Sequence, residues 1–95
     1  MATGIFAKRF HVFGMVQGVG FRFFAERVAL RLSVAGYARN LPDGRVEVYA
    51  IGTAAQLDAL RGELARGPRM ARVVRVDEEE AELQSDYANT FSIET

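Results

Sequence analysis

Residues 14–22 read GMVQGVGFR, and this stretch decides both the fold and the place of the site. An alternating apolar run precedes it and a helical apolar pattern follows it, so it connects a strand to a helix. It holds three glycines, which serve turns that need a positive φ or a close approach to a ligand. Such a turn directs successive backbone N–H groups at one point, and the first helical turn adds unpaired N–H groups and a positive dipole end. We interpret the stretch as a cradle for a phosphate or carboxylate.

Arg22 strengthens this interpretation, because a cation in the first turn of a helix is mildly unfavourable unless an anion binds there too. The familiar phosphate loops do not match. Val19 stands where a P-loop needs its second glycine, and the dinucleotide pattern that begins at Gly18 and Gly20 ends on Phe23. The alternative is an ordinary glycine-rich turn with an incidental arginine.

The composition predicts a small soluble cytoplasmic protein with one domain over residues 1–95. Twelve basic residues balance twelve acidic ones, and no basic block suggests a nucleic-acid partner. Cysteine is absent from the sequence, which excludes disulfides, thiolate metal sites and cysteine nucleophiles. Residues 1–4 lack the charged start of a signal peptide, and no apolar stretch is long enough to cross a membrane.

The apolar periodicity predicts four strands and two helices in the order β-α-β-β-α-β. Right-handed crossovers then give an α+β fold, the ferredoxin-like split βαβ sandwich, with a four-stranded antiparallel sheet, both helices on one face and the other face open. The expected strands are Ile5–Met15, Ser33–Asn40, Arg45–Ile51 and Met70–Asp77, and the expected helices are Phe21–Leu32 and a segment from Thr53 to Gly67.

The same patterns predict the core and several local features. Thr53 and Gln56 are spaced as a capping box. A bulge is expected between Val73 and Val76, and Phe91–Ile93 forms a short alternating segment that can return to the sheet edge. The expected core residues on the first strand and the two helices are Phe6, Phe10, Val12, Phe24, Val28, Leu32, Leu57, Leu60 and Leu64.

A second motif, GYARN at residues 36–40, precedes the turn LPDG at residues 41–44. For the fold to close, this strand must return near the first strand and its loop. Asn40 would then project towards the cradle. The alternative is that Asn40 caps the hairpin turn.

Together the two stretches resemble the acylphosphatase family. Its first motif, G-x-V-Q-G-V-G-[FM]-R, matches every fixed place from Gly14 to Arg22. Its second, G-[FYW]-[AVC]-x-N-x-x-x-G-x-V with a spaced glycine, matches from Gly36 to Gly52. The resemblance covers nearly the whole chain, including its length and element order. One departure is the C-terminus, where family members often follow Phe-Ser-Ile with a basic residue and tyrosine, and this chain has Glu94-Thr95.

The resemblance implies hydrolysis of an acyl phosphate to a carboxylate and inorganic phosphate, which is then both product and competitor. It implies that Asn40 positions the attacking water. It also implies that the phosphate is bound by Arg22 and by the loop amides of Val16, Gln17, Gly18, Val19 and Gly20. The residues suit this chemistry, because Asn40 can orient water but cannot take its proton at neutral pH, and a carboxylate leaving group needs no protonation.

We expect no cofactor, no metal and a monomer. The acidic run at residues 77–80 is expected to be a solvated edge, and His11 a surface residue on the sheet face away from the helices. Five arginines look like a cluster along the chain, but we expect the fold to disperse them: Arg61, Arg66, Arg69, Arg72 and Arg75.

Two alternatives differ in function. The first is a non-enzymatic ferredoxin-like module that binds an anion or RNA, with Phe13 and Tyr49 on the open sheet face; the neutral charge and the third strand, which lacks an RNP1 signature, argue against RNA. The second keeps the family but makes the chain part of a carbamoyl-transfer system acting on carbamoyl phosphate, which would require a separate partner protein.

Overall fold

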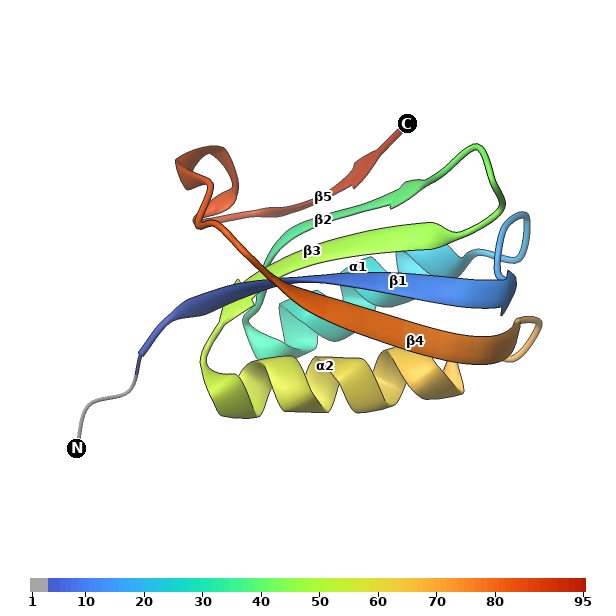
Figure 1. The fold of residues 1–95 in the computed structure, drawn as a ribbon, viewed down its shortest axis with the longest axis horizontal. Helices are drawn as coiled ribbons and strands as arrows, with labels where there is room; N and C mark the ends of the chain where they lie inside the picture. Colours follow the sequence, from blue (N-terminus) through green and yellow to red (C-terminus); the bar gives the residue numbers. More distant parts are fainter. Residues whose placement is uncertain (1–3) are drawn as a thin grey trace.

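The structure, a computed structural model, describes residues 4–95 and places two helices against one face of a five-stranded sheet (Figure 1). The expectation about a leader at residues 1–3 lies outside the described part. Along the chain, the elements are β1 (Phe6–Met15), α1 (Phe21–Leu32), β2 (Ala35–Asn40), β3 (Val46–Gly52), α2 (Ala54–Arg66), β4 (Arg72–Ala81), a 3-10 turn (Ser85–Tyr87) and β5 (Phe91–Glu94). The strand order across the sheet is β4-β1-β3-β2-β5.

The predicted β-α-β-β-α-β order is confirmed, but the sheet is not four-stranded and antiparallel. β5 adds a fifth strand and pairs in parallel with β2, from Gly36 opposite Phe91 to Arg39 opposite Glu94. The sheet is therefore mixed. Phe91 gives this short strand its anchor, because its side chain is buried in the core shared with the helices.

The sheet face away from the helices is partly covered rather than open. The connection from β4 to β5 passes over one end of it, and the Tyr49 hydroxyl donates to the carbonyl of Glu82 while accepting from the N–H of Gln84. The ring of Tyr87, in the same connection, lies 5.0 Å from the ring of Tyr37 between centroids. Alternate residues of β3 pack in the helical core, while Tyr49 and Ile51 lie in a second apolar cluster with Tyr87, so every residue of β3 is buried.

The helical core follows the predicted pattern with one exception. Phe10 and Val12 of β1 are fully buried, and so are the three predicted leucines of α2. Phe6 lies on the same side of the strand as Phe10 but is half exposed. It pairs with Gly52, the last residue of β3, at the end of β1 that projects past the helices in Figure 1.

The β4 strand contains the predicted bulge and is longer than predicted. Phe13 is opposite Arg75 and Gly14 is opposite Val73, so Val74 is the extra residue. Beyond the predicted end at Asp77, the strand continues to Ala81 as an exposed acidic edge. Basic residues of β1 stabilise this extension, with the Lys8 ammonium 2.6 Å from the Glu78 carboxylate.

One end of the molecule gathers the segments that matter for function. The β1–α1 loop, the β2–β3 hairpin, the α2–β4 loop and the C-terminus all lie at the same end in Figure 1. This follows from strand direction, because β1, β2 and β5 run in one sense and β3 and β4 in the other. The two motifs found in the sequence therefore meet there.

Candidate active site

The loop at residues 16–20 has the backbone of an anion cradle. Gly18 and Gly20 have φ angles of 76° and 77°, in the left-handed region that favours glycine. A Cβ added to either would have no atom within 4 Å, so these positions need glycine for conformation and not for space. The loop is thus open to a ligand from outside.

The N-terminus of α1 is not satisfied by side chains of the described residues. Gly20 is its N-cap residue, no side chain caps it, and the first turn holds no acidic residue. Helix N–H groups that lack such partners attract an anion, which the helix dipole also favours. The loop backbone and the helix start therefore point to one anion-binding place.

Apolar contacts hold the cradle in position. Val16 is fully buried, and Val19 packs against the core from the other side of the loop. Gly14, just before the loop, approaches β4 so closely that a Cβ would overlap the carbonyl oxygen of Arg72. The loop is therefore attached to the sheet on both sides of its open turn.

Arg22 is partly buried and its direction is fixed by the last strand. Its Nη1 donates a hydrogen bond to the carbonyl oxygen of Glu94 at 2.8 Å. Sequence reasoning missed this contact, and no side-chain pattern reveals it, because the acceptor is a backbone carbonyl. Its consequence is that β5 turns the guanidinium towards the end of β2.

Asn40 is the last residue of β2 and lines a cavity of about 570 Å³ with Arg39, Leu41, Pro42 and Thr95. The hairpin turn after it is held by other groups. The N–H of Leu41 donates to Arg45 at 2.9 Å, and the Asp43 carboxylate accepts from the N–H of Arg45 at 3.2 Å. Asn40 forms no side-chain hydrogen bond within residues 4–95, so it is not the residue that caps this turn.

Gln17 joins the two motifs through its side chain. Its Nε2 donates to the carbonyl oxygens of Leu41 at 2.8 Å and of Arg45 at 2.9 Å. The sequence pattern placed Gln17 at the site only through its backbone amide. The side-chain contact was missed for the same reason as that of Arg22, since both acceptors are backbone carbonyls.

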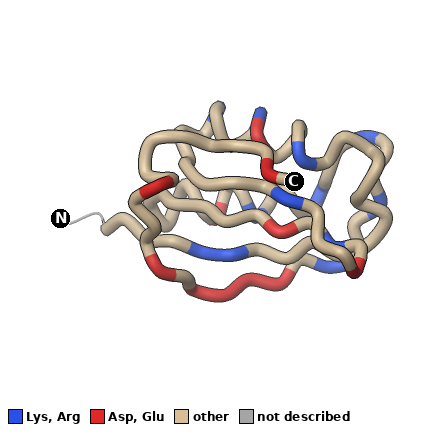
Figure 2. The backbone as a smooth tube through the Cα atoms, turned by 90° about the horizontal axis from the view of Figure 1, so that it is seen from above, with Lys and Arg blue, Asp and Glu red and all other residues tan. Residues whose placement is uncertain are grey.

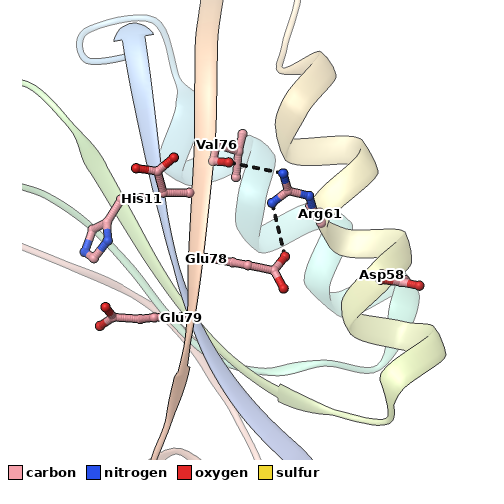
Figure 3. Close-up of a pocket in the computed structure, with 7 residues that line it drawn as sticks. His11, Asp58, Arg61, Val76, Glu78 and Glu79 are labelled. Carbon is pink, nitrogen blue, oxygen red and sulfur yellow. Dashed lines mark hydrogen bonds and ion pairs between the residues drawn. The ribbon is translucent and has the colours of Figure 1, made fainter.

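A larger cavity, of about 760 Å³, lies elsewhere, between α2 and the β4 edge (Figure 3). Its walls carry Asp58, Asp77, Glu78 and Glu79, and Arg61 reaches from α2 to donate to the Val76 carbonyl at 3.2 Å. Hydrogen bonding from Lys8, helped by the charge of Arg61, lowers the pKa of Glu78. These acidic walls repel an anion, so the smaller cavity beside Arg39 and Asn40 suits an anionic ligand better. Within residues 4–95, no three His, Asp or Glu side chains are grouped to hold a metal ion.

On the face away from the helices, Phe13 is partly exposed but the guanidinium of Arg75 lies over its ring at 4.0 Å, and the tyrosine rings are buried. Tyr49 is fully buried and Tyr37 is 7% exposed. Beside them lies Glu47, which is 5% exposed and accepts hydrogen bonds from Tyr37 and Arg39. His11 faces this side as predicted, but it is not a surface residue, because it is partly buried with Nε2 3.1 Å from the Glu47 carboxylate.

The mixed sheet with two helices on one face defines a ferredoxin-like domain, and the loop with Arg22 at the end of β1 is its candidate anion site. A family model of acylphosphatases matches residues 8–93. The acylphosphatase of Solibacter usitatus is 54% identical over 79 residues, which are 83% of this chain and 82% of that protein. The crystal structure of acylphosphatase from Bacillus subtilis superposes with a TM-score of 0.88 at 32% identity, covering 97% of this chain and all of that one.

The chain therefore belongs to the acylphosphatase family, and its activity is the hydrolysis of acyl phosphates. The crystal structure of HypF from T. kodakarensis is also similar, with a TM-score of 0.83 at 32% identity, but this chain covers only 12% of it. That likeness is to one part of a much longer protein. Among the described residues, no helix is both long and apolar enough to cross a membrane.

Proposed function

We propose that the loop amides of residues 16–20 and the guanidinium of Arg22 bind the phosphoryl group, while Asn40 orients the water that attacks it. The observation that carries this proposal is the contact between Arg22 and β5. Glu94, whose carbonyl holds Arg22, is the register partner of Arg39, and Arg39 precedes Asn40. The two polar side chains are thus brought to the same end of neighbouring elements, beside the cradle.

The reaction then needs position and charge more than acid–base groups. The water oxygen attacks phosphorus, the bond from phosphorus to the acyl oxygen breaks, and the carboxylate leaves with the electron pair. A phosphate oxygen of the substrate accepts the water proton, because Asn40 only orients the water. Arg22 presents a planar fork that matches two phosphate oxygens, and preorganised donors of this kind stabilise the charge that develops.

Hydrolysis of benzoyl phosphate, with a chelator present and inorganic phosphate as competitor, tests the cradle. In Arg22→Gln we expect turnover to fall by about 10²–10³-fold, as for loss of one preorganised donor, and inhibition by phosphate to weaken strongly. Arg27→Gln, on the exposed side of α1, is the matched control and should behave as the parent. Near-parental kinetics in Arg22→Gln would contradict the assignment.

Asn40→Ala tests the second role. We expect phosphate to inhibit this variant with nearly the parental constant while turnover collapses, since only the water loses its partner. Asn89→Ala, an exposed asparagine in the β4–β5 connection, provides the control. Equal loss of phosphate affinity and turnover would make Asn40 part of the cradle instead.

We further propose that the chain works as a cytoplasmic monomer and that the inorganic phosphate it releases competes with the substrate. A cradle that binds the phosphoryl group must also bind the released phosphate, which supports competition. Sedimentation velocity of the enzyme during turnover measures the oligomeric state, and a dimer at micromolar concentration would contradict the proposal.

A further inference from the structure

The side chain of Gln17 bridges the cradle to the hairpin that follows Asn40. Its Nε2 donates two hydrogen bonds, to the carbonyl oxygen of Leu41 at 2.8 Å and to that of Arg45 at 2.9 Å. These carbonyls lie on the two arms of the hairpin, on either side of the turn at residues 42–44. One amide group therefore holds both arms at once.

The hairpin is also closed by backbone hydrogen bonds of its own. The N–H of Leu41 donates to the Arg45 carbonyl at 2.9 Å, and the N–H of Gly44 donates to the Leu41 carbonyl at 3.1 Å. The hairpin thus has hydrogen bonds of its own, and the two hydrogen bonds from the Gln17 side chain are additional. They fix where the hairpin lies relative to the cradle rather than whether it forms.

The chemistry of this bridge requires a primary amide. Two carbonyl acceptors call for two donors on one nitrogen, which the carboxamide supplies. A carboxylate at this position would place its oxygens against both carbonyls and offer no proton, and a thioether such as methionine would keep the length but lose the donors. Lysine has the donors but brings a charge beside the phosphate, so its kinetics would mix two effects.

We infer that the Gln17 side chain is a positioning residue, which sets the distance between the bound phosphoryl group and the water held by Asn40. The inference rests on the proposed role of Asn40. Leu41, which accepts the shorter of the two bonds, directly follows Asn40 in the chain. A displacement of about 1 Å between reacting groups is enough to lower a rate by about 10²-fold.

Gln17→Met tests the bridge with little change in side-chain size. We expect kcat for benzoyl phosphate to fall by about 10- to 100-fold, while the inhibition constant of inorganic phosphate changes less than about threefold, because the cradle amides remain. Gln84→Met makes the same chemical change at an exposed position in the β4–β5 connection and should leave both constants at parental values. A variant that loses thermal stability but keeps kcat would show a merely structural role and overturn the inference.

A double-mutant cycle with Asn40→Ala separates this inference from the proposed function. If Gln17 acts through Asn40, then Gln17→Met lowers kcat in the parent but by less than about threefold in the Asn40→Ala background. Multiplicative losses in the double variant would overturn the positioning role while leaving Asn40 as the water-orienting residue. Parental turnover of Asn40→Ala alone would instead contradict the proposed function. Phosphate affinity falling together with kcat in Gln17→Met would mean that the Gln17 side chain supports phosphate binding, and would overturn the positioning role.

Discussion

Among residues 4–95, Glu47 is the one charged side chain that is buried. It lies on the sheet face away from the helices, 5% exposed, with Arg39 2.7 Å and Arg9 3.5 Å from its carboxylate oxygens. Burial alone would raise the pKa of Glu47, but hydrogen bonds from His11 and Tyr37 and the charge of Arg39 outweigh it and lower the pKa below its ordinary value of 4.5. The carboxylate is therefore ionised in the folded protein and holds together groups from β1, β2 and β3.

The lowered pKa of Glu47 predicts how stability depends on pH. A depressed folded pKa stabilises the protein above the unfolded pKa, near 4.5, and this contribution is lost as pH falls through the folded pKa. Glu47→Gln should lower the free energy of unfolding by about 2 kcal/mol at pH 7, because hydrogen bonds to a charged group are lost. It should also flatten the decline in the free energy of unfolding as pH falls below about 4.5, because the ionised Glu47 no longer contributes to that decline.

Urea unfolding at a series of pH values measures both effects. Glu80→Gln is the control, since Glu80 is exposed on the β4 edge and has no salt bridge within the described residues. Equal acid slopes for the parent and Glu47→Gln would show that other carboxylates carry the pH dependence.

Replacing glycine by alanine should have opposite effects on stability at two positions, one in the cradle and one in α2. Gly20 has a left-handed backbone at the cradle, so Gly20→Ala should destabilise the protein by about 1–2 kcal/mol and weaken phosphate inhibition. Gly62 lies within α2, without a positive φ or a close neighbour, so Gly62→Ala should stabilise by about 0.5–1 kcal/mol and leave kinetics unchanged. Thermal unfolding and phosphate inhibition of both variants provide the measurement. Parental phosphate affinity in Gly20→Ala would show that the cradle tolerates a different loop backbone.

At the scale of elements, the start of α2 shows a prediction that the structure confirms in atomic detail. The Thr53 hydroxyl accepts from the N–H of Gln56 at 3.2 Å, and the Gln56 side chain accepts from the N–H of Thr53 at 2.8 Å. The capping box lies at the end of the molecule away from the cradle. It should therefore affect stability without affecting chemistry.

Thr53→Ala removes one side of the capping box. We expect the free energy of unfolding to fall by about 1 kcal/mol, the usual cost of losing an N-cap side chain, with kcat and KM unchanged. Thr53→Ser keeps the acceptor and should recover most of the stability. A fall in kcat larger than the fall in folded fraction would mean that α2 and the site are coupled.

The elements show what the sequence could and could not predict. Helices and central strands were predictable because long apolar patterns fix their type and their buried side. The alternation at Phe91–Ile93 indicated a segment that can return to the sheet edge, and β5 does so, but its parallel pairing with a strand more than fifty residues earlier leaves no local signal. The extension of β4 was missed because acidic residues have low strand propensity, and here Lys8 and Arg9 compensate from across the sheet. Phe6 was misplaced because alternation indicates a face, not whether a helix covers it.

In the candidate site, too, some features could be predicted from the sequence and others could not. The glycines of the cradle and Arg22 stand out in the sequence because their residue types are unusual at their positions, whereas Asn40 was singled out by the family motif in which it lies. The contacts that orient them do not stand out, because Arg22 and Gln17 both bond to backbone carbonyls, which every residue has. A side-chain pattern therefore finds the groups proposed to bind the substrate and misses the contacts that orient them.

At the scale of the whole molecule, a net charge of zero conceals an uneven distribution. Figure 2 shows the acidic run along the β4 edge, and basic positions gathered at the end that carries the cradle. The predicted dispersal of the arginines is only partly right. Arg61 and Arg75 pair with Glu78 and Asp77, while Arg69 and Arg72 form no salt bridge within residues 4–95. Arg72 is the register partner of Met15, next to the cradle loop.

This distribution predicts that an anionic substrate is attracted to the cradle end before it binds. The electrostatic field of nearby cations raises the local concentration of an anion. Salt at 0.1 M screens this field over about 10 Å. Replacing Arg69 and Arg72 together by glutamine should therefore lower kcat/KM for benzoyl phosphate about threefold at 10 mM salt, leave kcat unchanged, and have little effect at 0.5 M salt. Arg31→Gln, at the far end of α1, removes a cation away from the cradle and should show no such salt dependence. A loss that persists at 0.5 M salt would mean that Arg69 or Arg72 touches the substrate directly, and then the site would extend across the α2–β4 loop.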